Sequence, residues 1–198
     1  MKMDSNLSLT TNQTKQNIMT AFWNLYTENR IEKITVTQIC THAGYNRSTF
    51  YKYFLDVYDV LDKIEEQIIT PEMLEKSVVS YLLLDNKKLA FENIIQLFEK
   101  SSGYIPVLLG EHGDSAFRHK LMNKLIPAVS SHLNVSITAN KKTKYILEYQ
   151  SAAIFNTIAN WYANGKDIPT EEFIQLLLSI STNGVQQELI KNVFAITL

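Results

Sequence analysis

Two helical patterns that meet at a glycine constrain the fold of this chain more than any other feature of its sequence. The first opens on Thr35, an N-cap candidate that forms a capping box with Gln38 three residues later. Gly44 follows the pattern directly, as expected where a helix ends in the left-handed region. A second short helical pattern starts near Asn46. The sequence therefore predicts a helix-turn-helix over residues 35–54.

The remaining sequence predicts an all-α protein. Only four prolines and six glycines interrupt its 198 residues, and apolar residues recur mostly at helical spacing. Helical patterns begin near residues 11, 35, 46, 56, 73, 87, 115, 141 and 170. Thr70-Pro71 is a further helix start, and we place a domain boundary there. We expect a helix-turn-helix domain of three helices in residues 1–70 and a helical bundle in residues 71–198.

Charge and cysteine content limit the class of protein. The formal net charge is −1 and the isoelectric point is about 6.4, so any positive surface for a nucleic acid is local. Residues 31–55 hold Lys33, Arg47 and Lys52 against Glu32. Cys40 is the only cysteine, the N-terminus has no apolar signal region, and no apolar run is long enough to span a bilayer. We expect a cytoplasmic protein that has no membrane partner.

The second helical pattern carries the side chains that a recognition helix needs. Short hydrogen-bonding residues occupy its N-terminal end, where a helix in the major groove comes closest to the base edges. Arg47 has the geometry to bind both acceptors of a guanine. The alternative is a short surface helix with ordinary solvated side chains.

These residues resemble a known family. Residues 34–39 (ITVTQI) and 43–54 (AGYNRSTFYKYF) are similar to the signature of the tetracycline-repressor (TetR/AcrR) family. The resemblance implies a transcriptional regulator, usually a repressor, that binds double-stranded DNA as a homodimer. By position, it implies DNA contacts from Thr35, Thr37, Tyr45, Asn46, Arg47, Ser48, Thr49, Tyr51, Lys52 and Tyr53.

One position departs from the family pattern. A lysine that supports a phosphate contact usually opens the fourth helix, and Val57 stands there between Asp56 and Tyr58. With so few basic residues per subunit, useful affinity requires two copies on a two-fold operator.

Two C-terminal helical patterns predict the dimer interface. Small residues around Ala152 would let a neighbouring helix approach closely, and the last strong pattern has one apolar stripe. The interface candidates are Ala152, Phe155, Phe173, Leu176, Leu177 and Ile180. The alternative is that both stripes face the core of their own subunit.

A small-molecule effector site is expected among the middle helices, as the resemblance implies. The candidate lining residues are aromatic or methionine: Phe91, Phe98, Tyr104, Phe117, Met122, Tyr149 and Trp161. The same set also fits a plain hydrophobic core. A second alternative is a regulatory domain that binds a protein partner and no small molecule.

Other chemistry finds little support in the sequence. No phosphate-binding glycine loop, nucleophile motif or paired-carboxylate pattern is present, so we expect no enzyme and no cofactor. The histidines around His112 match no metal-binding spacing, and we expect no metal.

Overall fold

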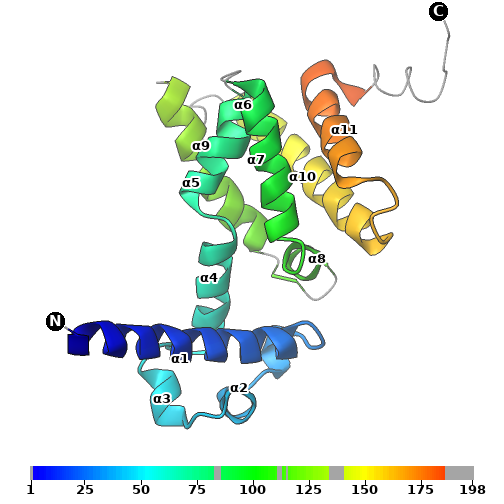
Figure 1. The fold of residues 1–198 in the computed structure, drawn as a ribbon. Coiled ribbons are helices and arrows are strands. Elements are labelled where there is room, and N and C mark those ends of the chain that lie inside the picture. Colours follow the sequence, from blue (N-terminus) through cyan, green and yellow to red (C-terminus); the bar gives the residue numbers. More distant parts are fainter. Residues whose placement is uncertain (1, 83–85, 111–112, 115, 134–140, 186–198) are drawn as a thin grey trace, which may run out of the picture. The chain divides into compact units, whose positions relative to one another are not determined.

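The chain is built from helices. A computed structural model describes residues 2–82, 86–110, 113–114, 116–133 and 141–185, and every regular element in these ranges is helical. The predicted all-α class is confirmed. The chain divides into two compact units, Met1–Ile68 and Ile69–Leu198 (Figure 1).

The first unit is a small bundle around one long helix. Its elements are α1 (Lys2–Tyr26), the 3₁₀ turn η1 (Ile31–Lys33), α2 (Val36–Ala43), α3 (Arg47–Tyr51) and α4 (Val57–Ile68). Helix α1 packs against α2 and α4, and α2 packs against α3. One face of α1 supplies much of the core, because Ile18, Phe22 and Tyr26 are fully buried. The helix itself is longer than the sequence pattern indicates, since it begins at Lys2 and not near Thr11.

The turn between α2 and α3 has the predicted geometry. Gly44 adopts φ +73°, and its backbone N–H donates to the carbonyl of Cys40. Tyr45 N–H donates to the same carbonyl at 3.0 Å. A residue with a β-carbon is strained in this region of φ and ψ, and glycine is not. The glycine therefore lets the chain reverse within two residues and start α3.

The second unit surrounds its core with seven α-helices and one π-helical segment in the described ranges. They are α5 (Pro71–Leu74), the π-helix η2 (Glu75–Val79), α6 (Ser80–Leu82), α7 (Lys87–Lys100), α8 (Ile105–Leu108), α9 (Phe117–Leu133), α10 (Lys141–Ala163) and α11 (Thr170–Asn183). Helix α7 contacts η2 and α11, and α9 contacts α5, η2 and α10. Pro127 lies inside α9. The predicted loop 134–140 and the tail beyond residue 185 lie outside the described residues.

An aromatic stack joins the last two helices. The rings of Trp161 on α10 and Phe173 on α11 lie 4.2 Å apart and within 5° of parallel. The Trp161 indole N–H donates to the carbonyl of Ile168 at 2.8 Å, so the connecting turn is fixed as well. Helix α11 begins at Thr170, as the pattern near residue 170 predicts, and Pro169 holds its N-cap position.

Replacing Gly44 with alanine tests the turn. A β-carbon at Gly44 would meet no atom within 4 Å, so only backbone strain changes, and we expect a loss of about 1 kcal/mol of unfolding free energy. Urea unfolding followed by circular dichroism measures it. Gly103→Ala is the matched control, because that site is equally open and has no positive φ. Equal stability of the two variants would contradict the strain at Gly44.

Candidate nucleic-acid interface and ligand cavity

Helix α3 has a polar side that is exposed to solvent and an apolar side that packs into the core. Phe50 is fully buried, and its ring lies 5.7 Å from that of Phe54. Arg47, Ser48 and Lys52 are exposed. The helix has five residues, because Lys52 N–H and Tyr53 N–H bond back to the third residue before them and tighten its last turn. The short helical pattern that starts near Asn46 therefore yields little more than one turn of regular α-helix.

Asn46 holds the start of α3 through one oxygen atom. Its Oδ1 accepts hydrogen bonds from Thr49 N–H at 2.8 Å, from the Ser48 hydroxyl at 2.7 Å and from the Thr49 hydroxyl at 3.0 Å. A five-residue helix cannot form by itself in water, so this cap and the burial of Phe50 position the helix. Asn46, Ser48 and Thr49 thus order one another before any ligand arrives.

The predicted capping box at the start of α2 is present. The hydroxyl oxygen of Thr35 accepts from Gln38 N–H at 3.3 Å, and Gln38 Oε1 accepts from Thr35 N–H at 2.9 Å. The Thr35 hydroxyl itself donates to Gln38 Oε1 at 2.8 Å. The capping box satisfies the N–H groups of Thr35 and Gln38, so the donors that this exposed end offers to a phosphate are the N–H groups of Val36 and Thr37.

Arg47 is oriented by a residue of the preceding helix. Its guanidinium donates a hydrogen bond to the hydroxyl of Thr37, and both side chains are exposed. This contact joins the outer faces of α2 and α3. It also reduces the number of rotamers that the arginine samples, which lowers the entropy lost when it binds a base.

The tyrosines divide into one exposed residue and two that are held by α1. Tyr51 is 59% exposed, with its ring edge against Phe50. The Tyr45 hydroxyl accepts from the Asn17 amide at 3.0 Å, and Lys15 Nζ lies 5.8 Å from the centre of the Tyr53 ring. Lys15 therefore adds a positive charge beside α3. The sequence pattern did not reveal it, because Lys15 lies far from the motif in the chain.

Carboxylates occupy the start of α4. Asp56 Oδ1 accepts from the N–H groups of Tyr58 and Asp59, each at 2.9 Å. Asp59 Oδ2 accepts from Leu55 N–H at 2.9 Å. These bonds satisfy N–H groups that would otherwise be available to an anion, and they place negative charge where the family pattern has a lysine. Val57 itself is half-buried.

Cys40 is a buried residue of α2, close to Arg47 of α3. Burial raises the pKa of its thiol, although nearby Arg47 acts in the opposite direction. A raised pKa reduces the thiolate fraction and hence the reactivity.

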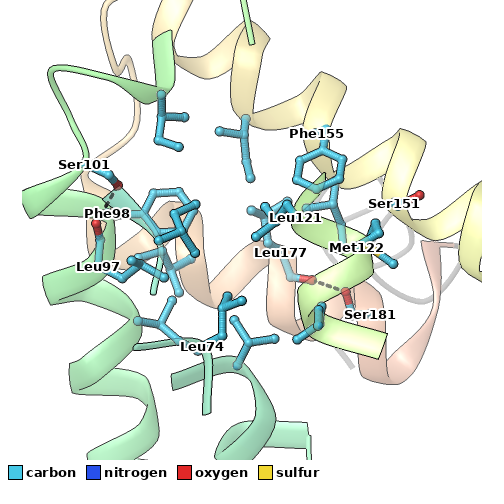
Figure 2. A pocket seen from close by; sticks show the side chains of 18 of the residues that line it. Leu74, Leu97, Phe98, Ser101, Leu121, Met122, Ser151, Phe155, Leu177 and Ser181 are labelled. Carbon is cyan, nitrogen blue, oxygen red and sulfur yellow. Dashed lines mark hydrogen bonds between the residues drawn. The ribbon is translucent and has the colours of Figure 1, made fainter. Parts of the chain in front are cut away.

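The second unit contains an apolar cavity of about 280 Å³. Figure 2 shows side chains converging on it from several helices, among them Leu74, Leu97, Leu121 and Phe155. A concave, largely apolar pocket with a few polar groups is the usual form of a small-molecule site, so this cavity is a candidate ligand site.

The predicted effector residues divide between the cavity and other places. Phe98, Phe117 and Met122 line it. Phe91, Tyr104, Tyr149 and Trp161 do not belong to the lining. Trp161 is held in the aromatic stack with Phe173, and Tyr149 is 70% exposed, because it lies on the opposite side of α10 from the lining residues.

The predicted interface residues divide as well. Phe155 and Phe173 are only 8% and 2% exposed, and Phe155 and Leu177 line the cavity, so these side chains serve their own subunit. Ala152 is exposed, and Leu176 and Ile180 are partly exposed. The exposed side of α10 carries an apolar face of five residues: Tyr145, Ile146, Tyr149, Ala152 and Ala153. We call it the α10 face.

The described residues contain neither a metal-ligand cluster nor a membrane-spanning helix. Within the described ranges, no group of three or more histidine, cysteine, aspartate or glutamate side chains could hold a metal ion. Glu111 and His112 lie outside those ranges. No helix of the described chain is long and apolar enough to cross a membrane.

Comparisons with known proteins agree on one family. Residues 85–183, half of the chain, match a TetR-type family model described as a transcriptional regulator C-terminal region. The fold is similar to the crystal structure of a TetR transcriptional regulator from Streptococcus agalactiae 2603V, with a TM-score of 0.61 and 20% sequence identity. That similarity covers 91% of this chain and 98% of the other. No curated protein sequence matches the chain.

Replacing Asn46 with alanine tests the cap of α3. Loss of the Oδ1 acceptor should destabilise the start of this helix by about 1 kcal/mol. Hydrogen exchange of the Thr49 amide should then be faster by about fivefold to tenfold. Asn46→Asp keeps the acceptor and should retain slow exchange. Unchanged exchange in Asn46→Ala would show that the cap does not hold the helix.

Proposed function

This chain belongs to the TetR family of transcriptional regulators, and from that membership we propose that it is a homodimeric repressor of palindromic operator DNA. The observation that carries the proposal is the surface of α3, where a capped and anchored helix presents Arg47 and Ser48 to solvent. A DNA-binding regulator acts where the DNA is, so we assign it to the cytoplasm.

We assign sequence reading to the N-terminal end of α3. Arg47 donates to guanine O6 and N7, and Ser48 and Thr49 have hydroxyls within the same turn. Tyr51, Lys52 and the start of α2 at Thr35 bind phosphates. To bind a phosphate oxygen, the Thr35 hydroxyl must give up its hydrogen bond to Gln38 Oε1.

The charge of the protein supports a dimer. One copy neutralises few phosphates because the chain has a net charge of −1, and the acidic start of α4 reduces that number further. We propose that the α10 face, together with Leu176 and Ile180 of α11, pairs with its own copy. Its apolar residues are exposed in a single chain, which is unfavourable unless another surface covers them.

The cavity supports control by a small molecule over control by a protein partner. Ile69 lines the cavity and directly follows Ile68, the last residue of α4. Lys124 on α9 donates to the Ile69 carbonyl at 3.3 Å. We propose that an effector filling the cavity moves Ile69 and α5, and that the chain transmits this movement to α4. The operator is released when the two copies of α3 no longer match their half-sites.

Selection of bound fragments from random DNA tests the proposal most broadly. We expect recovery of a palindrome whose half-sites are separated by about one helical turn or a multiple of it. Recovery of no symmetric sequence would contradict both DNA reading and the dimer.

Two substitutions separate base reading from phosphate binding. Arg47→Ala should reduce the preference for the selected palindrome over random DNA by about tenfold or more per half-site. Lys52→Ala should weaken binding to both DNAs alike. The slope of log K against log salt concentration should become shallower by about the value for one phosphate contact per subunit. Gel shifts at several salt concentrations measure both effects. An equal loss of specific and random binding in Arg47→Ala would remove its base-reading role.

A charge on the α10 face tests the dimer. Ala152→Glu would place two carboxylates close together across the two-fold axis and desolvate both, so the dimer should dissociate and operator affinity should fall. Light scattering at micromolar protein gives the mass. Gln96→Glu adds the same charge to an exposed position of α7 and should leave the mass unchanged. A wild-type protein that is already monomeric, or an Ala152→Glu dimer, would contradict the assignment.

A further inference from the structure

The side chains that line the cavity are almost entirely apolar. Among the 24 residues that line it, 19 carry hydrocarbon or thioether side chains, and none of the 24 is charged. The five polar lining residues are Tyr81, Ser101, Gln150, Ser151 and Ser181. A ligand inside therefore meets almost no charge-compensating group.

The three serines contribute acceptors and no donors. Ser101 donates its hydroxyl hydrogen to the Leu97 carbonyl at 2.5 Å, and Ser181 donates to the Leu177 carbonyl at 2.8 Å, both shown in Figure 2. Ser151 donates to the Glu148 carbonyl at 3.1 Å. A hydroxyl has one hydrogen and two lone pairs, so each serine offers only lone pairs to a guest. Ligand O–H or N–H groups can bond to these lone pairs, and donors toward a ligand acceptor come only from Tyr81 and Gln150.

The volume sets the size of the guest. A cavity of about 150 Å³ in another protein holds one benzene, which gives about 25 Å³ per non-hydrogen atom. The cavity of about 280 Å³ therefore holds about eleven such atoms.

We propose that the effector is an uncharged, mainly hydrocarbon molecule, of which the cavity covers about eleven non-hydrogen atoms, with polar groups no more numerous than Tyr81, Gln150 and the three serines can satisfy. The inference rests on the proposed function, since it names the ligand class of the proposed effector site. A cation or carboxylate would lose its hydration on entry and find no counter-ion in the lining. The cavity thus selects against cationic dyes and fatty-acid anions and accepts a medium-chain alcohol or a bicyclic aromatic.

Matched probes test the ligand class on the full-length protein. 1-Decanol and 2-naphthol are neutral and have about eleven non-hydrogen atoms, whereas decylammonium and decanoate have the same chain with opposite charges. Titration calorimetry and the midpoint of thermal unfolding report binding below the aggregation concentration of each probe. At least one neutral probe should bind and stabilise the protein, and both ions should bind at least about 100-fold more weakly. Tighter binding of either ion would overturn the proposal.

Three variants locate the binding. Leu121→Trp fills the cavity from α9 and should abolish neutral-probe binding, whereas Asn123→Trp on the exposed side of α9 should not. Gln150→Glu places a carboxylate in the lining with little change of shape. It should weaken 1-decanol and strengthen decylammonium by about tenfold or more each. If Leu121→Trp fails to fold, the Gln150→Glu exchange of preference still decides the question, and its absence overturns the assignment.

DNA binding is measured separately, so the two proposals can fail independently. Neutral-probe binding without any operator complex would refute the proposed function and keep the ligand class. An operator complex without neutral-probe binding would refute the ligand class and keep the DNA-binding role. Release of operator DNA by 1-decanol or 2-naphthol, and not by decylammonium or decanoate, supports both.

Discussion

The burial of Phe50 is the contact on which the polar surface depends. Helix α3 has five residues, and a helix of that length has no stability of its own. The buried ring supplies apolar free energy that the exposed residues cannot, and the Asn46 cap fixes the first turn. Every group that faces outward from α3 is therefore positioned by one group that faces inward. Sequence reading, as proposed, depends on hydrophobic packing as much as on hydrogen bonding.

The second unit differs from the first because its core is incompletely filled. Its helices leave a partly open apolar cavity between them, lined by side chains from α5 to α11. A π-helical segment, Glu75–Val79, adjoins this volume through Val78, and Pro127 removes a backbone donor from α9. The unit therefore combines an unfilled apolar cavity with two helical segments whose regular backbone hydrogen bonding is interrupted.

Local signals were readable from the sequence, and distant ones were not. The capping box of Thr35 and Gln38 and the turn at Gly44 depend on neighbours within a few residues, and both are present. An apolar stripe such as that around Phe155 predicts that its side chains are buried. It does not indicate whether they pack against their own subunit or against a second copy. The stripe faces its own subunit, whereas Tyr149 on the other side is exposed. The cavity joins helices far apart in the chain, so no single stretch of sequence could predict it.

The carboxylates at the start of α4 have a consequence for how the protein responds to its surroundings. By closing the helix end, Asp56 and Asp59 leave few groups with which the protein can displace counterions from DNA. Binding that releases few counterions changes little when the ionic strength changes. The proposed operator complex should therefore lose less occupancy when salt rises than a complex made by a more basic regulator would.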